Sequence, residues 1–111
     1  MVVIERGGLY WADLDPVRDH EQGGSQPVLV LSHEPFNERS GTVIALAVTS
    51  QPQRAGYPLT RRLPDGLLSR QSWVKITQIR TLSSERLGAR LGHLEADEVN
   101  QVLAGLLQII A

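Results

Sequence analysis

The chain has 111 residues, of which 41% are hydrophobic and 21% charged, and a formal net charge of −1 at pH 7. This length and composition predict one folded domain over residues 1–111 and exclude both a disordered chain and a multidomain assembly. The chain has no cysteine, which excludes disulfide scaffolds, thiolate metal sites and thiol nucleophiles and favours a reducing, cytoplasmic location. Only four apolar residues precede Glu5 and Arg6, so the sequence predicts neither a signal peptide nor a membrane span.

Short apolar runs separated by glycine and proline predict strands along the first 94 residues. These runs cover residues 9–14, 27–32, 42–49, 56–60, 72–79 and 89–94, with a turn at Asp65-Gly66. From Val99 to Ile110, apolar residues recur every three or four positions after an acidic start, which predicts an amphipathic helix. Strands followed by one helix indicate an α+β fold, and strands this short favour a small barrel.

Positive charge is concentrated in the second half of the chain. Residues 51–93 carry eight basic and two acidic side chains, a net charge of +6, whereas residues 1–50 carry a net charge of −4. Seven of the eight basic residues are arginines, which make bidentate contacts with phosphate and stack on bases. The segment therefore predicts either a surface for a polyanion such as RNA or a solvated face that pairs with the acidic first half.

Two segments carry side chains suited to phosphate chemistry. A polar loop over residues 16–26 contains His20, which titrates near neutrality, and the pair Gly23-Gly24, whose amides can approach a phosphate closely. At the end of the third predicted strand, Thr49 and Ser50 supply two hydroxyls that can bond to a phosphoryl oxygen. The alternatives are a bystander histidine beside glycines that only make the turn, and a strand-end cap.

Six motifs follow one another along nearly the whole chain. They are RGGLYWADLDP at 6–16, EQGG at 21–24 before PVLVLS at 27–32, FN at 36–37, VTS at 48–50, QIRTL at 78–82, and RL at 86–87 with LGHL at 91–94. In this order and spacing they resemble the MazF/PemK/Kid toxins of bacterial toxin–antitoxin modules. The resemblance implies an SH3-like antiparallel β-barrel with a C-terminal α-helix, active as a homodimer and silenced by a cognate MazE-like antitoxin.

The resemblance also implies a metal-independent endoribonuclease that cuts single-stranded RNA at short sequences. In this chemistry the ribose 2′-hydroxyl attacks the adjacent phosphate and leaves a cyclic phosphate and a 5′-hydroxyl, so no cofactor is needed. The resemblance assigns catalysis to Thr49, at the family's threonine position, and to His20, which matches the histidine of the Kid-like branch. It assigns RNA contacts to Glu21, Gln22, Gly23, Gly24, Ser50, Arg54, Lys75, Thr77, Gln78 and Arg80. The pairs His20-Glu21 and His33-Glu34 are the alternative for a metal site.

The catalytic pattern of the family is changed at two polar positions. Gln26 stands immediately before the proline, where the family has an arginine taken to be catalytic; an amide donates a hydrogen bond but does not offset charge on phosphorus. Thr77 replaces a common acid, and Lys75 stands where some relatives carry a base. With Gln26 at the catalytic position, we expect His20 to transfer a proton and Lys75 or Arg54 to supply charge.

Two other functions stay open. Because Gln26 replaces the arginine, the protein can instead be a module that binds RNA or an antitoxin without cutting. A gyrase poison of the CcdB type shares the fold, but it acts through a tryptophan near the end of the last helix, and this chain has none after Trp73. Trp11 and Trp73, both on predicted strands, are interpreted as core or dimer-interface residues rather than base-stacking platforms.

Overall fold

The computed structural model describes residues 3–14 and 24–111. Its elements are β1 (Gly8–Asp13), β2 (Ser25–Val30), α1 (Glu34–Ser40), β3 (Thr42–Thr49), β4 (Thr60–Arg62), β5 (Trp73–Ser83), the short 3-10 helix η1 (Ser84–Arg86), β6 (Leu87–His93) and α2 (Ala96–Ile110). No helix in these residues is long and apolar enough to cross a membrane.

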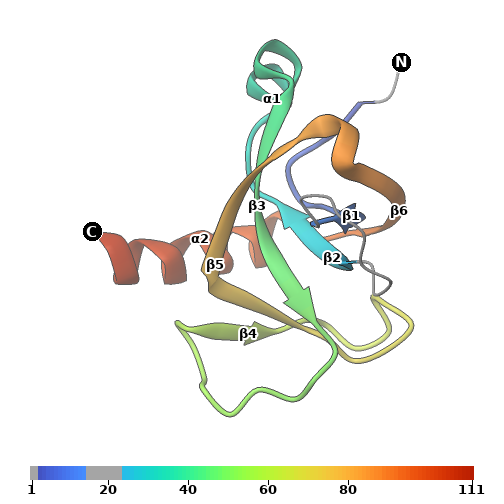
Figure 1. Ribbon diagram of the computed structural model, residues 1–111. Helices are drawn as coiled ribbons and strands as arrows, with labels where there is room; N and C mark the ends of the chain where they lie inside the picture. Colours follow the sequence, from blue (N-terminus) through green and yellow to red (C-terminus); the bar gives the residue numbers. More distant parts are fainter. Residues whose placement is uncertain (1–2, 15–23) are drawn as a thin grey trace.

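All six strands belong to one antiparallel sheet with the order β4-β5-β3-β2-β1-β6 (Figure 1). The long strands β3 and β5 cross the centre of the molecule, and α2 runs along one side with its C-terminal end projecting past β5 (Figure 1). Within the described residues the edge strands β4 and β6 are not paired with each other, so the small barrel is partly open. The sheet and the C-terminal helix confirm the predicted α+β fold.

The core has two parts because successive side chains of a strand point to opposite faces of a sheet. We call the face against α2 the helix face; its buried residues include Leu9, Leu29, Leu46, Val48, Val74 and Ile76, which cluster with Val99 and Val102 of α2. The other face, here the second face, buries Tyr10, Ala12, Val28, Val30, Val43, Ala45 and Leu82. Strand β3 contributes to both clusters, so its two faces are fixed along its whole length.

The predicted and observed structures differ most at β4 and α1. The fourth strand lies at Thr60–Arg62 rather than at 56–60, because residues 56–59 turn back on themselves: the amides of Leu59 and Thr60 both donate to the Gly56 carbonyl, at 2.9 and 3.1 Å. Helix α1 is absent from the sequence prediction. It has proline in its first turn and ends at Gly41, which adopts the left-handed conformation with φ of 69°.

Candidate functional site

Strand register aligns Thr49 with residues of two neighbouring strands. Thr49 of β3 lies opposite Trp73 of β5, and Trp73 lies opposite Arg62 of β4. One row further along, Lys75 of β5 lies opposite Thr60 of β4 and a residue of β3 that continues the second face. Residues directly opposite in antiparallel strands project from the same side of the sheet, with Cα atoms about 5 Å apart. The second face therefore carries a threonine hydroxyl, an indole, a guanidinium and an ammonium group next to one another.

Gln26 of β2 lies beside the same end of β3. It lies two residues before Val28, a second-face residue, and its side-chain amide donates to the Val48 carbonyl at 3.4 Å. The hydroxyl oxygen of the neighbouring Thr49 accepts a hydrogen bond from the backbone amide of Gln51 at 3.1 Å. This bond is the strand-end cap considered above, and it leaves the hydroxyl proton of Thr49 available to a phosphoryl oxygen.

Ser50 points to a different surface from Thr49. It lines a pocket of about 480 Å³ together with Trp11, Pro27, Leu67, Leu68, Ser69, Arg70, Ser72 and Leu91. Trp11 is 42% exposed and lines this pocket, so it is not a core residue. The two hydroxyls expected at the end of this strand are thus divided between two surfaces.

The remaining RNA-contact candidates of β5 lie around a bulge. Leu46 pairs with Ile79 and the next residue of β3 pairs with Lys75, so residues 76–78 of β5 have no partners across from them. Thr77 and Gln78 are exposed in this bulge, and Arg80, also exposed, resumes the second face beyond it. Because a bulge bends a strand and redirects its side chains, this one opens the polar part of the second face toward solvent.

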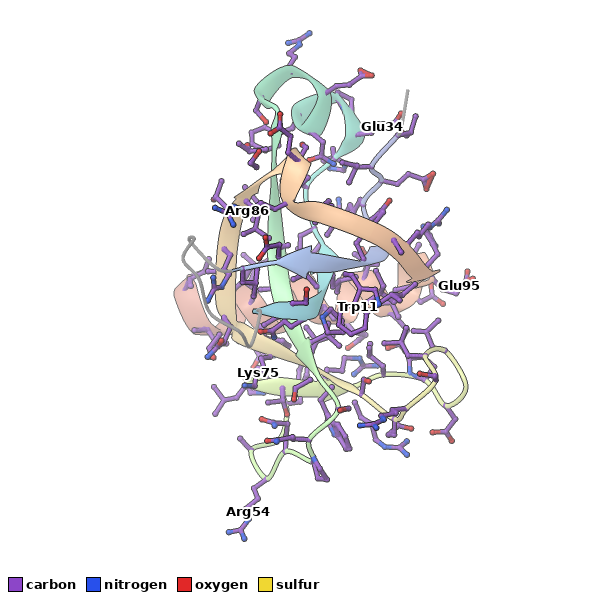
Figure 2. All side chains as sticks on the ribbon, turned by 45° about the vertical axis from the view of Figure 1, so that its right-hand side comes forward. Trp11, Glu34, Arg54, Lys75, Arg86 and Glu95 are labelled. Carbon is purple, nitrogen blue, oxygen red and sulfur yellow. The ribbon has the colours of Figure 1, made fainter. Side chains whose placement is uncertain are left out.

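The other candidate residues either lie away from this face of the sheet or fall outside the residues that the structure describes. Arg54 extends into solvent from the loop after β3, away from the sheet, whereas Lys75 lies at the sheet (Figure 2). His20, Glu21, Gln22 and Gly23 lie outside the described residues. Gly24, the first residue after that gap, accepts a hydrogen bond from the Leu14 amide at 3.1 Å.

The second histidine candidate, His33, is engaged elsewhere: its Nε2 lies 2.9 Å from Nη1 of Arg6, which donates to it. Among residues 3–14 and 24–111, no three His, Cys, Asp or Glu side chains come together as metal ligands.

A second pocket, of about 320 Å³, opens beside Thr49. It is lined by Gln53, Ala55, Gly56, Tyr57, Thr60, Arg61, Arg62 and Trp73. The sequence does not predict this pocket. Trp73, interpreted above as a core or dimer-interface residue, is half-buried in the pocket wall and so is not a core residue. A signal was present: from Trp73 to Ile76 polar or aromatic residues alternate with buried aliphatic ones, which predicts an indole on the polar side of the strand.

This pocket is held against α2 by a set of linked contacts. Nε and Nη2 of Arg61 donate to the two carboxylate oxygens of Glu98 at 2.9 and 3.0 Å. The guanidinium lies 5.8 Å from the centre of the Tyr57 ring, and the Tyr57 hydroxyl donates to the Gln101 carbonyl at 2.8 Å. The hydrogen bond with Glu98 raises the pKa of Arg61 above its ordinary value. The loop between β3 and β4 is thereby anchored to the helix.

Two arginines of the basic segment form ion pairs with carboxylates within the part of the chain that the structure describes. Arg61 pairs with Glu98 of α2, and Arg62 pairs with Asp65 at 3.1 Å between exposed side chains. Both acids lie in the second half of the chain, whereas two other contacts of residues 51–93 reach the first half: Arg86 Nη1 donates to the Asp13 carbonyl at 3.1 Å, and His93 Nε2 lies 3.6 Å from Glu5 Oε1. An exposed pair such as Arg62 and Asp65 is weak and exchanges readily for a polyanion.

Comparison with known proteins places this architecture in a family. Residues 5–110 match the model of the PemK-like, MazF-like toxin of type II toxin–antitoxin system. The chain is 36% identical over 103 residues to endoribonuclease EndoA of Bacillus subtilis (strain 168), covering 91% of this chain and 89% of that protein. It superposes on crystalline MazF of Deinococcus radiodurans with a TM-score of 0.82 at 32% identity, over 99% and 98% of the two chains. A MazE–MazF structure from the same organism gives a TM-score of 0.79 at 28% identity, over 99% and 97%. The chain belongs to the PemK-like, MazF-like toxins of type II toxin–antitoxin systems.

Proposed function

We propose that this protein is a toxin that cleaves single-stranded RNA at specific short sequences without a metal ion. The observation that carries the proposal is the grouping of Gln26, Thr49 and Lys75 on one sheet face of a chain that is 36% identical to an endoribonuclease. These groups donate hydrogen bonds or carry positive charge, which is what a phosphate gaining negative charge in the transition state requires.

In the proposed reaction the ribose 2′-oxygen forms a bond to phosphorus and the bond from phosphorus to the 5′-oxygen breaks. His20 takes the proton of the attacking hydroxyl, and the leaving 5′-oxygen takes up one proton from solvent. Thr49 and Gln26 donate hydrogen bonds to the phosphoryl oxygens, while Lys75 offsets their charge. Further RNA contacts are proposed for Glu21, Gln22, Gly23, Gly24, Ser50, Arg54, Thr77, Gln78 and Arg80.

We propose that the protein works as a homodimer of one-domain chains in the cytoplasm, controlled by a MazE-like antitoxin. A MazE–MazF assembly is among the structures similar to this chain. The C-terminal end of α2 carries apolar side chains that the described residues leave largely exposed: Leu107 is 57% exposed and Ile110 is 67% exposed. Such a surface suits either a dimer contact or an antitoxin segment.

The test is cleavage of a long single-stranded RNA by the purified protein in EDTA, with sequencing of the fragment ends. We expect discrete cuts that disappear in Thr49→Ala. The matched control is Thr81→Ala, because Thr81 is an exposed threonine of the same sheet but lies opposite Ile44, on the helix face. Equal cleavage by wild type and Thr49→Ala would remove Thr49 from the site.

His20→Ala tests the proton-transfer role separately. We expect it to abolish cleavage and leave the melting temperature unchanged, as measured on the same RNA and by thermal unfolding. Unchanged cleavage would remove His20 from the mechanism.

A binding module that captures RNA without cutting is the second candidate, and the amide at Gln26 favours it. Substituting Gln26→Arg separates the two. A working nuclease should change little, whereas a module that lacks the arginine should gain cleavage, since one such stabilising group is worth on the order of 10²–10³ in rate.

A further inference from the structure

The pocket beside Thr49, here the Trp73 pocket, has the composition of a nucleobase site. Two aromatic side chains, Trp73 and Tyr57, line it, and Tyr57 is 40% exposed. The Gln53 side chain adds an amide, which offers both a donor and an acceptor. Single-stranded RNA is recognised by stacking of bases on aromatic or guanidinium planes and by hydrogen bonds to the base edges. At about 320 Å³ the pocket lies at the small end of the range for ligand sites.

The position of the pocket relates it to the proposed cleavage site. Trp73 is the direct cross-strand partner of Thr49, and Arg62 is the next residue in the same row. A phosphate held at Thr49 therefore lies within a residue's width of the indole, and the Arg62 guanidinium lies on the far side of the indole. Asp65 pairs with that guanidinium at 3.1 Å, but both side chains are exposed and the pair is weak.

The pocket walls are fixed before any ligand arrives. Tyr57 is tied to α2 through its hydroxyl, and Arg61 is locked by the two hydrogen bonds to Glu98. A cavity that keeps its shape binds a ligand with less ordering cost than one assembled from flexible side chains. Arg61 is neutralised by its partner, so charge in this pocket comes chiefly from Arg62.

We propose that the Trp73 pocket binds one RNA base close to the scissile phosphate and so contributes to the choice of cleavage sequence. This inference rests on the proposed ribonuclease function. The base stacks on the indole of Trp73, and the Gln53 amide and Arg62 are the groups within the pocket that bond to its edge or to the neighbouring phosphate.

The first test measures tryptophan fluorescence, because the chain has only two tryptophans, Trp11 and Trp73. The probe is an RNA spanning a mapped cleavage site, with 2′-deoxyribose at the cleaved nucleotide, titrated into two single-tryptophan variants. In Trp11→Phe the remaining Trp73 emission should be quenched as RNA saturates the protein. In Trp73→Phe the remaining Trp11 emission should be quenched less than that of Trp73, because Trp11 lies in the pocket with Ser50 and not in the Trp73 pocket. Quenching of Trp11 alone, with RNA bound, would overturn the proposal.

The second test fills the pocket without removing the indole. A Cβ at Gly56 meets no atom within 4 Å, and its φ is not positive, so Gly56→Leu places its side chain in open space at the pocket wall. Gly88→Leu is the control, because a Cβ at Gly88 makes only ordinary contacts and Gly88 does not line the pocket. Gly56→Leu should weaken RNA binding about tenfold or more, in line with the loss of one stacked base, and Gly88→Leu should not.

An abasic scan identifies the base concerned. Wild type should lose affinity at one abasic position within about two nucleotides of the cleaved bond, and Trp73→Leu should be insensitive at that position, because Trp73→Leu keeps an apolar side chain but no stacking surface. Full sensitivity in Trp73→Leu, with unchanged affinity in Gly56→Leu, would overturn the proposal while leaving the ribonuclease function intact. Absence of both RNA binding and cleavage by wild type would refute the proposed function itself, and the base pocket with it.

Discussion

Asn37 holds three segments of the chain together, so an isosteric substitution there should be costly. It is 4% exposed, and its side-chain amide donates to the carbonyls of Ile4 and Ser32 at 2.8 and 3.1 Å. Its carbonyl oxygen accepts from the Ser32 hydroxyl, which in turn accepts from the Ile44 amide at 2.9 Å. The FN motif at 36–37 therefore has a structural explanation: α1 is pinned to the chain before β1 and to the start of β3.

Asn37→Asp keeps the shape of this side chain but replaces both N–H donors by an oxygen. Each buried carbonyl left without a partner costs about 1–3 kcal/mol, and two of them give a loss of about 3 kcal/mol. For a domain of this size the melting temperature should fall by about 12 °C at pH 7. The new carboxylate faces carbonyl oxygens, so its pKa is raised in the folded state and stability falls as pH rises through the acidic range.

The assay is thermal unfolding of wild type and Asn37→Asp between pH 4 and pH 7. The control is Asn100→Asp, an exposed position on α2, which should stay within about 0.5 kcal/mol of wild type. A melting temperature for Asn37→Asp within about 2 °C of wild type at pH 7, or a deficit that does not grow with pH, would refute this account of the network.

Two further substitutions test the contacts between the helix and the β3–β4 loop. Gly105→Ala should lower the melting temperature by about 4 °C, because the added Cβ lies 3.0 Å from Ile76 Cδ1 and from Tyr57 Cε1. Ile76 is buried and Tyr57 is tied to α2, so the crowding outweighs the gain in helix propensity of about 1 kcal/mol. A higher melting temperature in a thermal scan would contradict this. Glu98→Gln should lower the free energy of unfolding in urea by about 1 kcal/mol, because it removes the charge opposite Arg61 where both side chains are 27% exposed. This loss should shrink in 1 M salt. A loss that does not depend on salt would assign it to packing instead.

The strongly patterned elements were predictable because their burial follows a simple period. The observed β3 has the predicted bounds, and α2 contains all the apolar positions from Val99 to Ile110. Helix α1 was not predictable in this way: it has seven residues, its termination depends on the left-handed Gly41, and its one buried residue is the polar Asn37. Strand β4 is three residues long, too short to show any period.

The sequence supplies candidate residues for the site, whereas their arrangement depends on the fold. Thr49 and Ser50 are adjacent in sequence, and strand alternation places them on two surfaces. Trp73 and Lys75 lie beside the end of β3 because the register between β3 and β5 includes a bulge of three residues. No local sequence pattern specifies this bulge. The pairing of Arg61 with Glu98 joins a strand to a helix 37 positions away, so it too depends on the tertiary fold.

The most direct measurement compares two short RNAs that contain a mapped cleavage site, one fully ribose and one with a single 2′-deoxyribose at the cleaved nucleotide, both in EDTA. We expect the ribose strand to be cut into a cyclic phosphate and a 5′-hydroxyl end and the deoxy strand to stay intact at that bond. Cleavage of the deoxy strand there, or cutting of the ribose strand that stops in EDTA, would contradict metal-independent attack by the 2′-hydroxyl.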